Sequence, residues 1–344
     1  KPLPFDFTRA SSATVVNKQG LIETVGSGKP RIDFKDDAKG ALLLEPQRMN
    51  LVTYSEKLSN WTQDGATTLD NNIISPDGTL NASKITFNSG NERVYTFTNT
   101  TNGSFSAYFK GVQGKKVKLR DNSGTYFTEI TLTENWVRYY LYKETSNTNI
   151  QIQNIDADDV NVWGAQVEEG SYATSYIPNF GNSAGATRSA DSNTTQVATN
   201  SVIGQTEGTI FYDINFNNIE TSSQYIGVLS DGSSTNRIQF LNNISQDWQL
   251  FITASTISSN INLTTSATGV GRYKIAIAYK SGDVVFYVNG VQKGTSTETF
   301  TFSNLLHFDL GQRYDDSLFF NNPINNSKLY NTRLSNAELQ ALTT

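Results

Sequence analysis

Residues 273–294 read YKIAIAYKSGDVVFYVNGVQKG and show the clearest strand pattern in the chain. Side chains alternate between the two faces of a β-strand, so apolar residues such as Ile275 and Ile277 share one face. The Ser-Gly pair at 281–282 and the Asn-Gly pair at 289–290 suit two-residue turns that need positive φ. This stretch therefore predicts two consecutive β-hairpins.

The same rhythm continues on both sides of these hairpins. Short runs rich in Val, Ile, Thr, Tyr and Phe alternate with Gly, Asn, Asp and Ser clusters about every ten residues. The clearest runs span 93–100, 104–111, 115–121, 126–133, 136–144, 159–168, 208–217, 225–232, 237–242, 248–255, 273–280, 283–290, 306–312 and 327–332. Such spacing is typical of sandwiches and jelly rolls. The sequence predicts one short helix, at the C-terminus. It begins at a capping-box pattern formed by Ser335 and Glu338.

A polar stretch without a periodic apolar face, at about 176–201, indicates a domain boundary near residue 190. We therefore expect an all-β protein with two β-sandwich (jelly-roll) domains in tandem, at 51–190 and 191–344. Residues 1–50 are too rich in turn signals to form a core and are expected to be an extended N-terminal arm or a small β element. On this division, residues 201–344 should fold on their own.

Composition excludes several function classes. The 344 residues include no cysteine and one histidine, His307, which makes thiol chemistry, a Ser/His/Asp triad or a multi-histidine metal site difficult to build. A net charge of −5 argues against a nucleic-acid partner, because phosphate binding needs a basic patch. The sequence contains no apolar run of about 18 residues, so it predicts no membrane-spanning segment.

Residues 5–190 contain a series of strings in a recognisable order. They are FTRASSATVVNKQGLIETV, PRIDF, GALLLEPQRMNLVTYSE, SNW, SPDGTLNASKITF, SFSAYFKG, and VNVWGAQVEEGSYATSYIPN followed by TRSAD. In order and spacing these strings resemble a module of bacteriophage tail-fibre, tailspike and head-spike (head-fibre) proteins. The resemblance implies a phage surface fibre, usually a homotrimer, whose jelly roll is similar to a carbohydrate-binding module.

Residues 205–344 contain GTIFYDINF, the hairpin stretch above, LGQRYDDSLFFNNPINNSKLYN and TRLSNAELQAL. This half resembles a laminin-G or concanavalin-A-like lectin domain, which implies a β-sandwich fold. Asn325 and Asn326 stand where the family pattern has acidic residues. That departure puts a calcium site of the family type in doubt.

Three acidic clusters are candidates for a catalytic pair, because glycoside hydrolysis needs two carboxylates about 5–10 Å apart. Candidates lie at 156–159, 168–169 and 315–316. Adjacent strand residues point to opposite faces, so Glu168 and Glu169 do not readily form such a pair. We expect solvated turn carboxylates at these places, no catalytic residue, and a protein that is not an enzyme.

Sugar binding instead needs aromatic faces together with amide, carboxylate or guanidinium partners for hydroxyl groups. Rim loops of lectin-like sandwiches and one turn-borne tryptophan offer these groups. The predicted ligand-binding residues are Asp231, Asn236, Arg313, Tyr314, Asp315, Asp316 and Trp61. The alternatives are an ordinary hydrated rim and, for Trp61, a structural plug. The same loops could contribute to the roughly six to eight oxygen ligands of a Ca²⁺ ion, the one candidate cofactor.

The strand at 115–121 is expected to turn Val117 and Leu119 inward and Lys116, Lys118 and Arg120 outward. This basic stripe would suit an acidic capsule, or it is simply a solvated face.

Taken together, the sequence predicts a non-enzymatic phage fibre or spike component, assembled in the host cytoplasm and displayed on the virion surface. Its partners would be bacterial surface polysaccharide and other virion proteins, with weak sites made effective by multivalency in a homotrimer. One alternative is a purely structural fibre spacer or capsid decoration, which large exposed apolar patches would favour. The other is a secreted bacterial polysaccharide-binding module.

Overall fold

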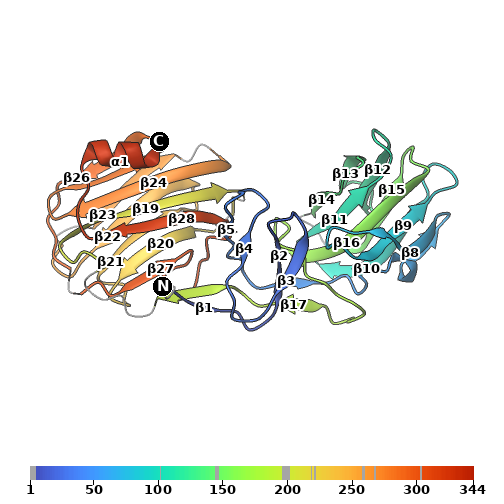
Figure 1. Ribbon diagram of the computed structural model, residues 1–344, viewed down its shortest axis with the longest axis horizontal. Helices are drawn as coiled ribbons and strands as arrows, with labels where there is room; N and C mark the ends of the chain where they lie inside the picture. The colour runs from blue at the N-terminus through green and yellow to red at the C-terminus, as the bar shows by residue number, and fades with distance from the viewer. Residues whose placement is uncertain are drawn as a thin grey trace. The chain divides into compact units, whose positions relative to one another are not determined.

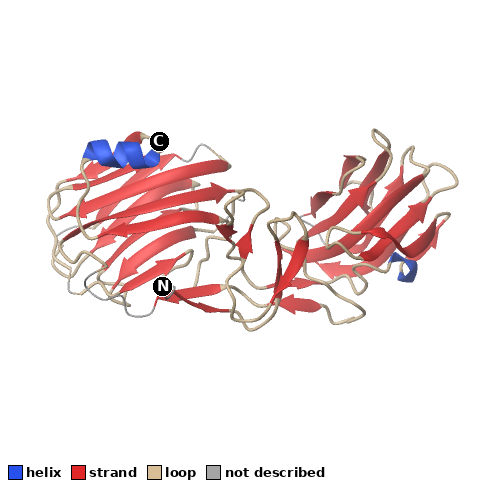
Figure 2. Ribbon diagram, in the orientation of Figure 1, coloured by secondary structure: helices blue, strands red, loops and turns tan. Residues whose placement is uncertain are grey.

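The computed structural model describes residues 5–100, 102–143, 147–195, 202–217, 219–220, 222–257, 260–266, 269–302 and 304–344 (Figure 1). Strands hold 51% of the residues and helix 3%. Figure 2 shows strands as the main elements of the chain and a helix next to the C-terminus. The prediction of an all-β protein with a short C-terminal helix is confirmed. The helix begins after Ser335, whose side chain accepts from the Glu338 N–H while the Glu338 carboxylate accepts from the Ser335 N–H, so the capping box is present.

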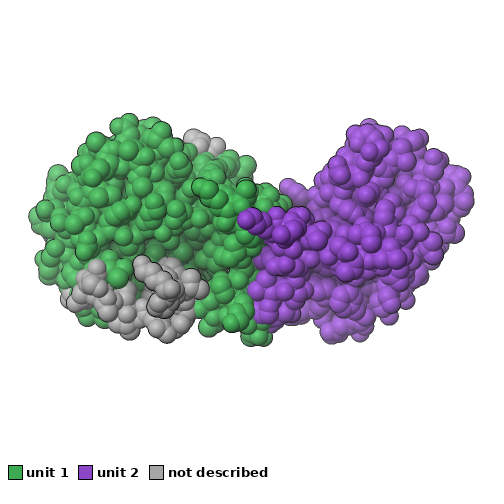
Figure 3. Space-filling view, in the orientation of Figure 1, with its two compact units in different colours: residues 1–10, 27–46, 190–344 green, residues 11–26, 47–189 purple. Residues whose placement is uncertain are grey.

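The chain forms two compact units, each built from separate pieces of sequence (Figure 3). Unit 1 contains Lys1–Ala10, Ser27–Pro46 and Ala190–Thr344, and unit 2 contains Ser11–Gly26 and Gln47–Ser189. The residues of the predicted N-terminal arm, 1–50, are therefore divided between the two units.

Unit 2 is a sandwich of two five-stranded antiparallel sheets, in the orders β13-β12-β15-β10-β7 and β14-β11-β16-β9-β8. Two smaller pairs, β2-β3 and β17-β6, complete it. Its elements are β2 (Ala13–Val16), β3 (Ile22–Val25), β6 (Arg48–Asn50), the 3₁₀ helix η1 (Leu58–Asn60), β7 (Thr62–Asp64), β8 (Thr67–Ile74), β9 (Leu80–Thr86), β10 (Arg93–Thr100), β11 (Gly103–Lys110), β12 (Lys116–Asp121), β13 (Phe127–Thr131), β14 (Val137–Lys143), β15 (Asn147–Asn154), β16 (Asp159–Glu169) and β17 (Ala186–Arg188).

Alternation along the strands fills the core of unit 2. Val117 and Leu119 of β12 are fully buried between the sheets, as the sequence predicts, while the charged residues between them lie on the outer face. On the outer face of the second sheet, the β2-β3 hairpin supplies Ile22 to a cluster with Trp163 and Tyr176, whose rings lie 4.5 Å apart. The hairpin thus covers apolar surface that a bare sheet would expose.

Unit 1 pairs a seven-stranded sheet, β26-β25-β24-β19-β28-β5-β4, with a five-stranded sheet, β23-β22-β21-β20-β27, and adds the pair β1-β18. Its elements are β1 (Phe5–Thr8), β4 (Ile32–Asp33), β5 (Ala41–Leu42), β18 (Ser192–Thr195), β19 (Glu207–Phe216), β20 (Gln224–Ser230), β21 (Arg237–Asn242), β22 (Asp247–Thr253), β23 (Ile261–Ser266), β24 (Gly271–Lys280), β25 (Val284–Val288), β26 (Val291–Ser296), β27 (His307–Leu310), β28 (Ile324–Tyr330) and α1 (Asn336–Thr343).

The two hairpins predicted from residues 273–294 are β24-β25 and β25-β26. Asn289 and Gly290 both have positive φ, at 47° and 76°, as their turn requires. Ile277 faces the core between the sheets, whereas Ala278 faces the opposite side, where Leu339 of α1 packs. The small alanine side chains on that face let the helix lie directly on the sheet.

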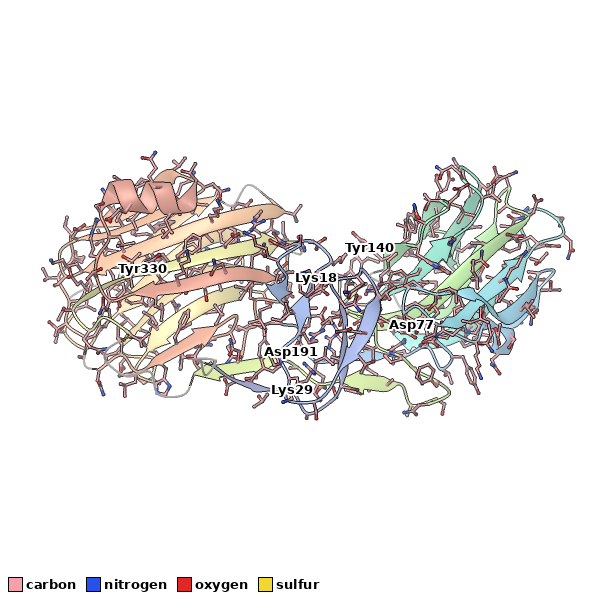
Figure 4. The ribbon with its side chains drawn as sticks, in the orientation of Figure 1. Lys18, Lys29, Asp77, Tyr140, Asp191 and Tyr330 are labelled. Atoms are coloured by element: carbon pink, nitrogen blue, oxygen red, sulfur yellow. The ribbon has the colours of Figure 1, made fainter. Side chains whose placement is uncertain are left out.

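A buried group of four charges ties the N-terminal segments into unit 1. Arg31 donates to Glu45 at 2.7 Å and to Asp191, and Arg9 donates to Asp191 at 2.8 Å. All four residues are buried, and Asp191 is labelled in Figure 4. Burial opposes the charge on Arg31, but the two carboxylates outweigh it and raise the arginine pKa above its ordinary value. Leu44, next to Glu45 in sequence, lies in the same unit's apolar core. Residues 27–46 are therefore a structural part of unit 1.

Candidate functional site

Trp61 is a core residue of unit 2. Only 4% of it is exposed, it belongs to the main apolar cluster, and its Nε1 donates to the Tyr54 carbonyl at 3.0 Å. Its ring offers no face to a ligand, so the structural-plug alternative describes this residue and the predicted binding role does not.

Asp231 and Asn236 hold together the turn between β20 and β21. The Asp231 carboxylate accepts from the Ser233 N–H and from Asn236 Nδ2, each at 2.9 Å, and Asn236 Oδ1 accepts from the Ser255 N–H at 3.2 Å. Partial burial acts to raise the pKa of Asp231, but the hydrogen bonds from Ser233 and Asn236 outweigh it and lower the pKa. The hydrogen bonds of both side chains therefore stabilise the turn.

The loop after β27 carries the other predicted residues and positions an aromatic ring. Two guanidinium groups lie close to the Tyr314 ring, that of Arg237 at 5.2 Å and that of Arg313 at 5.1 Å from the ring centroid. Arg313 Nη2 donates to the Tyr314 hydroxyl at 3.3 Å. Asp315 and Asp316 are exposed, and Asp315 lies 3.7 Å from Arg313. The structure thus brings together the four predicted residues of this loop.

Below this loop is the outer face of the five-stranded sheet of unit 1. Tyr314 packs against an apolar cluster that includes Tyr225 and Leu241. Gln239 of β21 lies between Val228 and Phe251 in a row of residues that pair across neighbouring strands. Its side chain is buried, and its Oε1 has no hydrogen-bond partner. An acceptor left this way in a sheet face can take a hydrogen bond from a ligand.

We name the Tyr314 surface after these residues: Tyr225, Arg237, Gln239, Phe251, Arg313 and Tyr314. Of these six residues, the sequence predicts a binding role for Arg313 and Tyr314 only. The alternation in RIQFLN (237–242) predicts that Arg237 and Gln239 share a face, but not that Tyr314 packs there.

Arg237 and Arg313 place positive charge on the Tyr314 surface, and the exposed carboxylates of Asp315 and Asp316 follow Tyr314 in the same loop. Burial raises the pKa of Tyr225, against the opposing effects of Arg313 and Arg237. Burial also lowers the pKa of Arg237. On β27 of the same sheet, burial, with help from the charge of Asp316, raises the pKa of Asp309 to about 7. A surface of this kind can stack on a sugar ring and donate hydrogen bonds from two guanidiniums.

Among the described residues, no group of three or more His, Cys, Asp and Glu side chains is arranged to hold a metal ion. Asn325, which stands where the family pattern has an acidic residue, donates from Nδ2 to Asp37 at 2.9 Å. A carboxylate at position 325 would lie close to that of Asp37 and repel it.

Unit 2 contains a buried carboxyl group of its own. Glu56 accepts from the Tyr176 hydroxyl at 2.9 Å and from Asn81 Nδ2 at 3.0 Å, and the same amide nitrogen also donates to Asp77, labelled in Figure 4. Burial, assisted by the charge of Asp77, raises the pKa of Glu56 from 4.5 to about 7, although the bond from Tyr176 acts against it.

This raised pKa predicts how stability depends on pH. The native state binds a proton at Glu56 more tightly than the unfolded chain, so its stability should fall as pH rises from about 4.5 to about 7. Glu56→Gln removes the titrating group and should stabilise unit 2 by about 2 kcal/mol at pH 8, with little effect at pH 4. Urea unfolding across this pH range measures the difference between variant and parent.

The control is Glu169→Gln, which changes an exposed carboxyl group of the same unit. Identical gains in the two variants, or a Glu56→Gln gain that does not depend on pH, would contradict the assignment.

No helix in the described part of the chain is long and apolar enough to cross a membrane.

Comparisons with known proteins agree with the lectin-like half of the sequence prediction. Residues 188–340 match the concanavalin A-like lectin/glucanases superfamily. Comparison with curated protein sequences gives no match. The phage resemblance of residues 5–190 stays a prediction.

Three similar solved structures come from carbohydrate-active proteins. The CBM40 of the Ruminococcus gnavus IT-sialidase is 15% identical, with a TM-score of 0.37 over 44% of this chain and 92% of that one. Domain 4 of AbnA, a GH43 extracellular arabinanase from Geobacillus stearothermophilus in complex with arabinotriose, is 16% identical, with a TM-score of 0.36 over 45% and 73%. The NanB sialidase of Streptococcus pneumoniae is 16% identical, with a TM-score of 0.37 over 41% and 25%.

Proposed function

We propose that this protein binds glycans without cleaving them, and that the Tyr314 surface of unit 1 is the binding site. The observation that carries the proposal is the partly exposed Tyr314 ring, which lies close to two guanidinium groups on a sheet face. The match of residues 188–340 to a superfamily of lectins and glucanases supports it.

The chemistry of the surface suits a sugar. A pyranose offers C–H groups on its faces and hydroxyl groups around its edge. The Tyr314 ring can contact the former, while Arg313 can donate to hydroxyl oxygens and Gln239 Oε1 can accept from a hydroxyl. Because the Tyr314 ring already packs on the sheet and accepts a hydrogen bond from Arg313, binding should order it little further and cost little conformational entropy.

Binding fits this surface better than hydrolysis does. A glycosidase needs a protonated and an ionised carboxyl group on either side of the scissile bond. Near Tyr314 the carboxyl group with a raised pKa is Asp309, which is buried on the sheet, whereas Asp315 and Asp316 are exposed neighbours in one loop.

The biological setting we propose is a phage fibre or spike on the virion surface, assembled in the host cytoplasm. The resemblance of residues 5–190 to phage fibre modules supports this setting, and it also supports a homotrimer that contacts other virion proteins. In a trimer, three weak sites for host polysaccharide would act together and raise the apparent affinity without new contacts.

Tyr314→Ala tests the site. We expect at least a tenfold loss of affinity for bacterial surface glycans on an array, because the aromatic face is removed, and a melting temperature within a few degrees of the parent. Tyr314→Phe keeps the face and should retain most of the affinity. Tyr140→Ala, at an exposed tyrosine of unit 2 (61% exposed, Figure 4), is the matched control.

If Tyr314→Ala bound the same glycans with the affinity of the parent protein, the Tyr314 surface would not be the binding site. Shortened glycan products after incubation with the parent protein would contradict the non-enzymatic proposal.

A further inference from the structure

The outer face of one sheet of unit 2 combines amides, aromatic rings and cations. Cross-strand pairing in the sheet β13-β12-β15-β10-β7 aligns these side chains in two rows. One row is Glu129, Lys118, Gln153, Arg93 and Asp64, and the other is Phe127, Arg120, Gln151, Tyr95 and Thr62. We call this surface the amide face. None of these residues was among those predicted to bind a ligand, although the outward direction of Lys118 and Arg120 was expected.

Amide groups of β15 form the floor of the amide face. Gln151 and Gln153 are only 3% and 7% exposed although they lie on an outer face, because longer side chains flank them. Gln153 is fully engaged, since its Oε1 accepts from Arg120 at 2.8 Å and its Nε2 donates to a carbonyl. Gln151 donates to Asn149 at 3.0 Å, but its Oε1 is buried without a hydrogen-bond partner. Such an acceptor costs stability unless a donor arrives from outside.

Aromatic rings stand beside this floor and are open to solvent. Phe97, which pairs with Asn149, is 66% exposed, and Phe127 is 49% exposed. Tyr95 lies 5.8 Å from Phe97 in an edge-to-face arrangement. Exposed rings next to a polar floor match a ligand that is itself apolar on its faces and polar at its edges, as a sugar is.

The charged side chains of the amide face indicate which class of ligand it can bind. Arg93 pairs with Asp64 at 2.7 Å, and Lys116 with Glu129 at 2.6 Å. Within the described part of the chain, Lys118 and Arg120 have no carboxylate in ion-pair contact. Lys118 instead lies 5.0 Å from the centre of the Phe127 ring. In a protein with a net charge of −5, this face therefore holds two cations whose charge no carboxylate contact neutralises, although Arg120 also donates to Gln153 and to the Asp121 carbonyl.

We propose that the amide face is a second binding site, for an acidic polysaccharide whose sugars carry carboxylate groups. The rings contact sugar faces, Lys118 and Arg120 pair with a sugar carboxylate, and a sugar hydroxyl donates to Gln151 Oε1. Two cations without a carboxylate partner are few for a nucleic acid, whose affinity grows with the number of phosphates neutralised.

The full chain is tested by affinity electrophoresis in gels containing polygalacturonate, alginate or hyaluronate. We expect retardation by at least one of these polymers, weakened by added salt, and at least fivefold weaker retardation by carboxyl-reduced polygalacturonate when polygalacturonate binds. Lys118→Glu should weaken binding at least tenfold. Lys18→Glu makes the same charge change at an exposed residue in the turn after β2 (Figure 4) and should change it less than twofold.

A second variant separates binding from folding. Gln151→Met keeps the length of the side chain but removes the amide, so we expect the melting temperature to stay within a few degrees while polymer binding falls at least fivefold. Tyr314→Ala should leave uronate binding unchanged, so the amide face and the Tyr314 surface can fail independently.

Four results would overturn the proposal: no retardation by any of the three polymers, equal retardation by the carboxyl-reduced polymer, equal losses in Lys118→Glu and Lys18→Glu, or equally tight binding of an oligo-dT strand. A change in solution mass in Phe97→Ser, with polymer binding retained, would also overturn it, because the face would then join two copies of the chain.

Discussion

Asp191→Ala should destabilise unit 1 by about 3–5 kcal/mol, the usual effect of removing one partner from a buried charge group. The substitution takes a carboxylate away from both Arg9 and Arg31 and leaves their charges buried. Unit 2 should be affected much less, because all four members of the group belong to unit 1.

Urea unfolding followed by tryptophan fluorescence measures this effect. Trp248 is buried in the core of unit 1, whereas Trp61, Trp136 and Trp163 belong to unit 2, so a Trp248→Phe background isolates the signal of unit 2. The control is Asp283→Ala, which breaks the ion pair of a half-exposed carboxylate with Arg333 and should cost about 1 kcal/mol or less. Equal costs for the two variants would show that the buried group does not hold unit 1 together.

Residues 190–344 expressed alone should be insoluble or incompletely folded. The sequence suggested that 201–344 would fold by itself, but the structure leads to the opposite expectation. Segment 27–46 supplies strands β4 and β5 next to β28, and it supplies Leu44 to the core. Without it β28 becomes an exposed edge and the place of Leu44 becomes a cavity, which typically costs about 2–5 kcal/mol.

A synthetic peptide of residues 27–46 provides the test. Added to the 190–344 fragment, it should increase solubility and restore part of a cooperative melt, because Arg31, Glu45 and Leu44 return together. A peptide with Leu44→Asp and Arg31→Glu is the control and should have no effect. A fragment that folds and melts cooperatively without any peptide would contradict the prediction.

Local patterns determined much of the fold. Alternation marked strands such as β24 and β12 and their inward faces, the Asn-Gly pair marked a hairpin turn, and the Ser335 capping box marked the helix. All of these depend on contacts between residues close in sequence. For the same reason the loop with Arg313 and Tyr314 could be identified, since it directly follows a clear strand.

Only the tertiary structure decided which distant segments meet. The burial of Trp61, the packing of Tyr314 on β20 and β21, and the assignment of segment 27–46 to unit 1 all depend on pairings between residues far apart in the chain. The amide face shows the limit most clearly. Alternation alone places Lys118 and Arg120 outward, but the register of β15 against β10 and β12 puts Gln151 between Arg120 and Tyr95. Strand register is set by packing across the whole sheet and not by any one strand, so no local pattern could supply it.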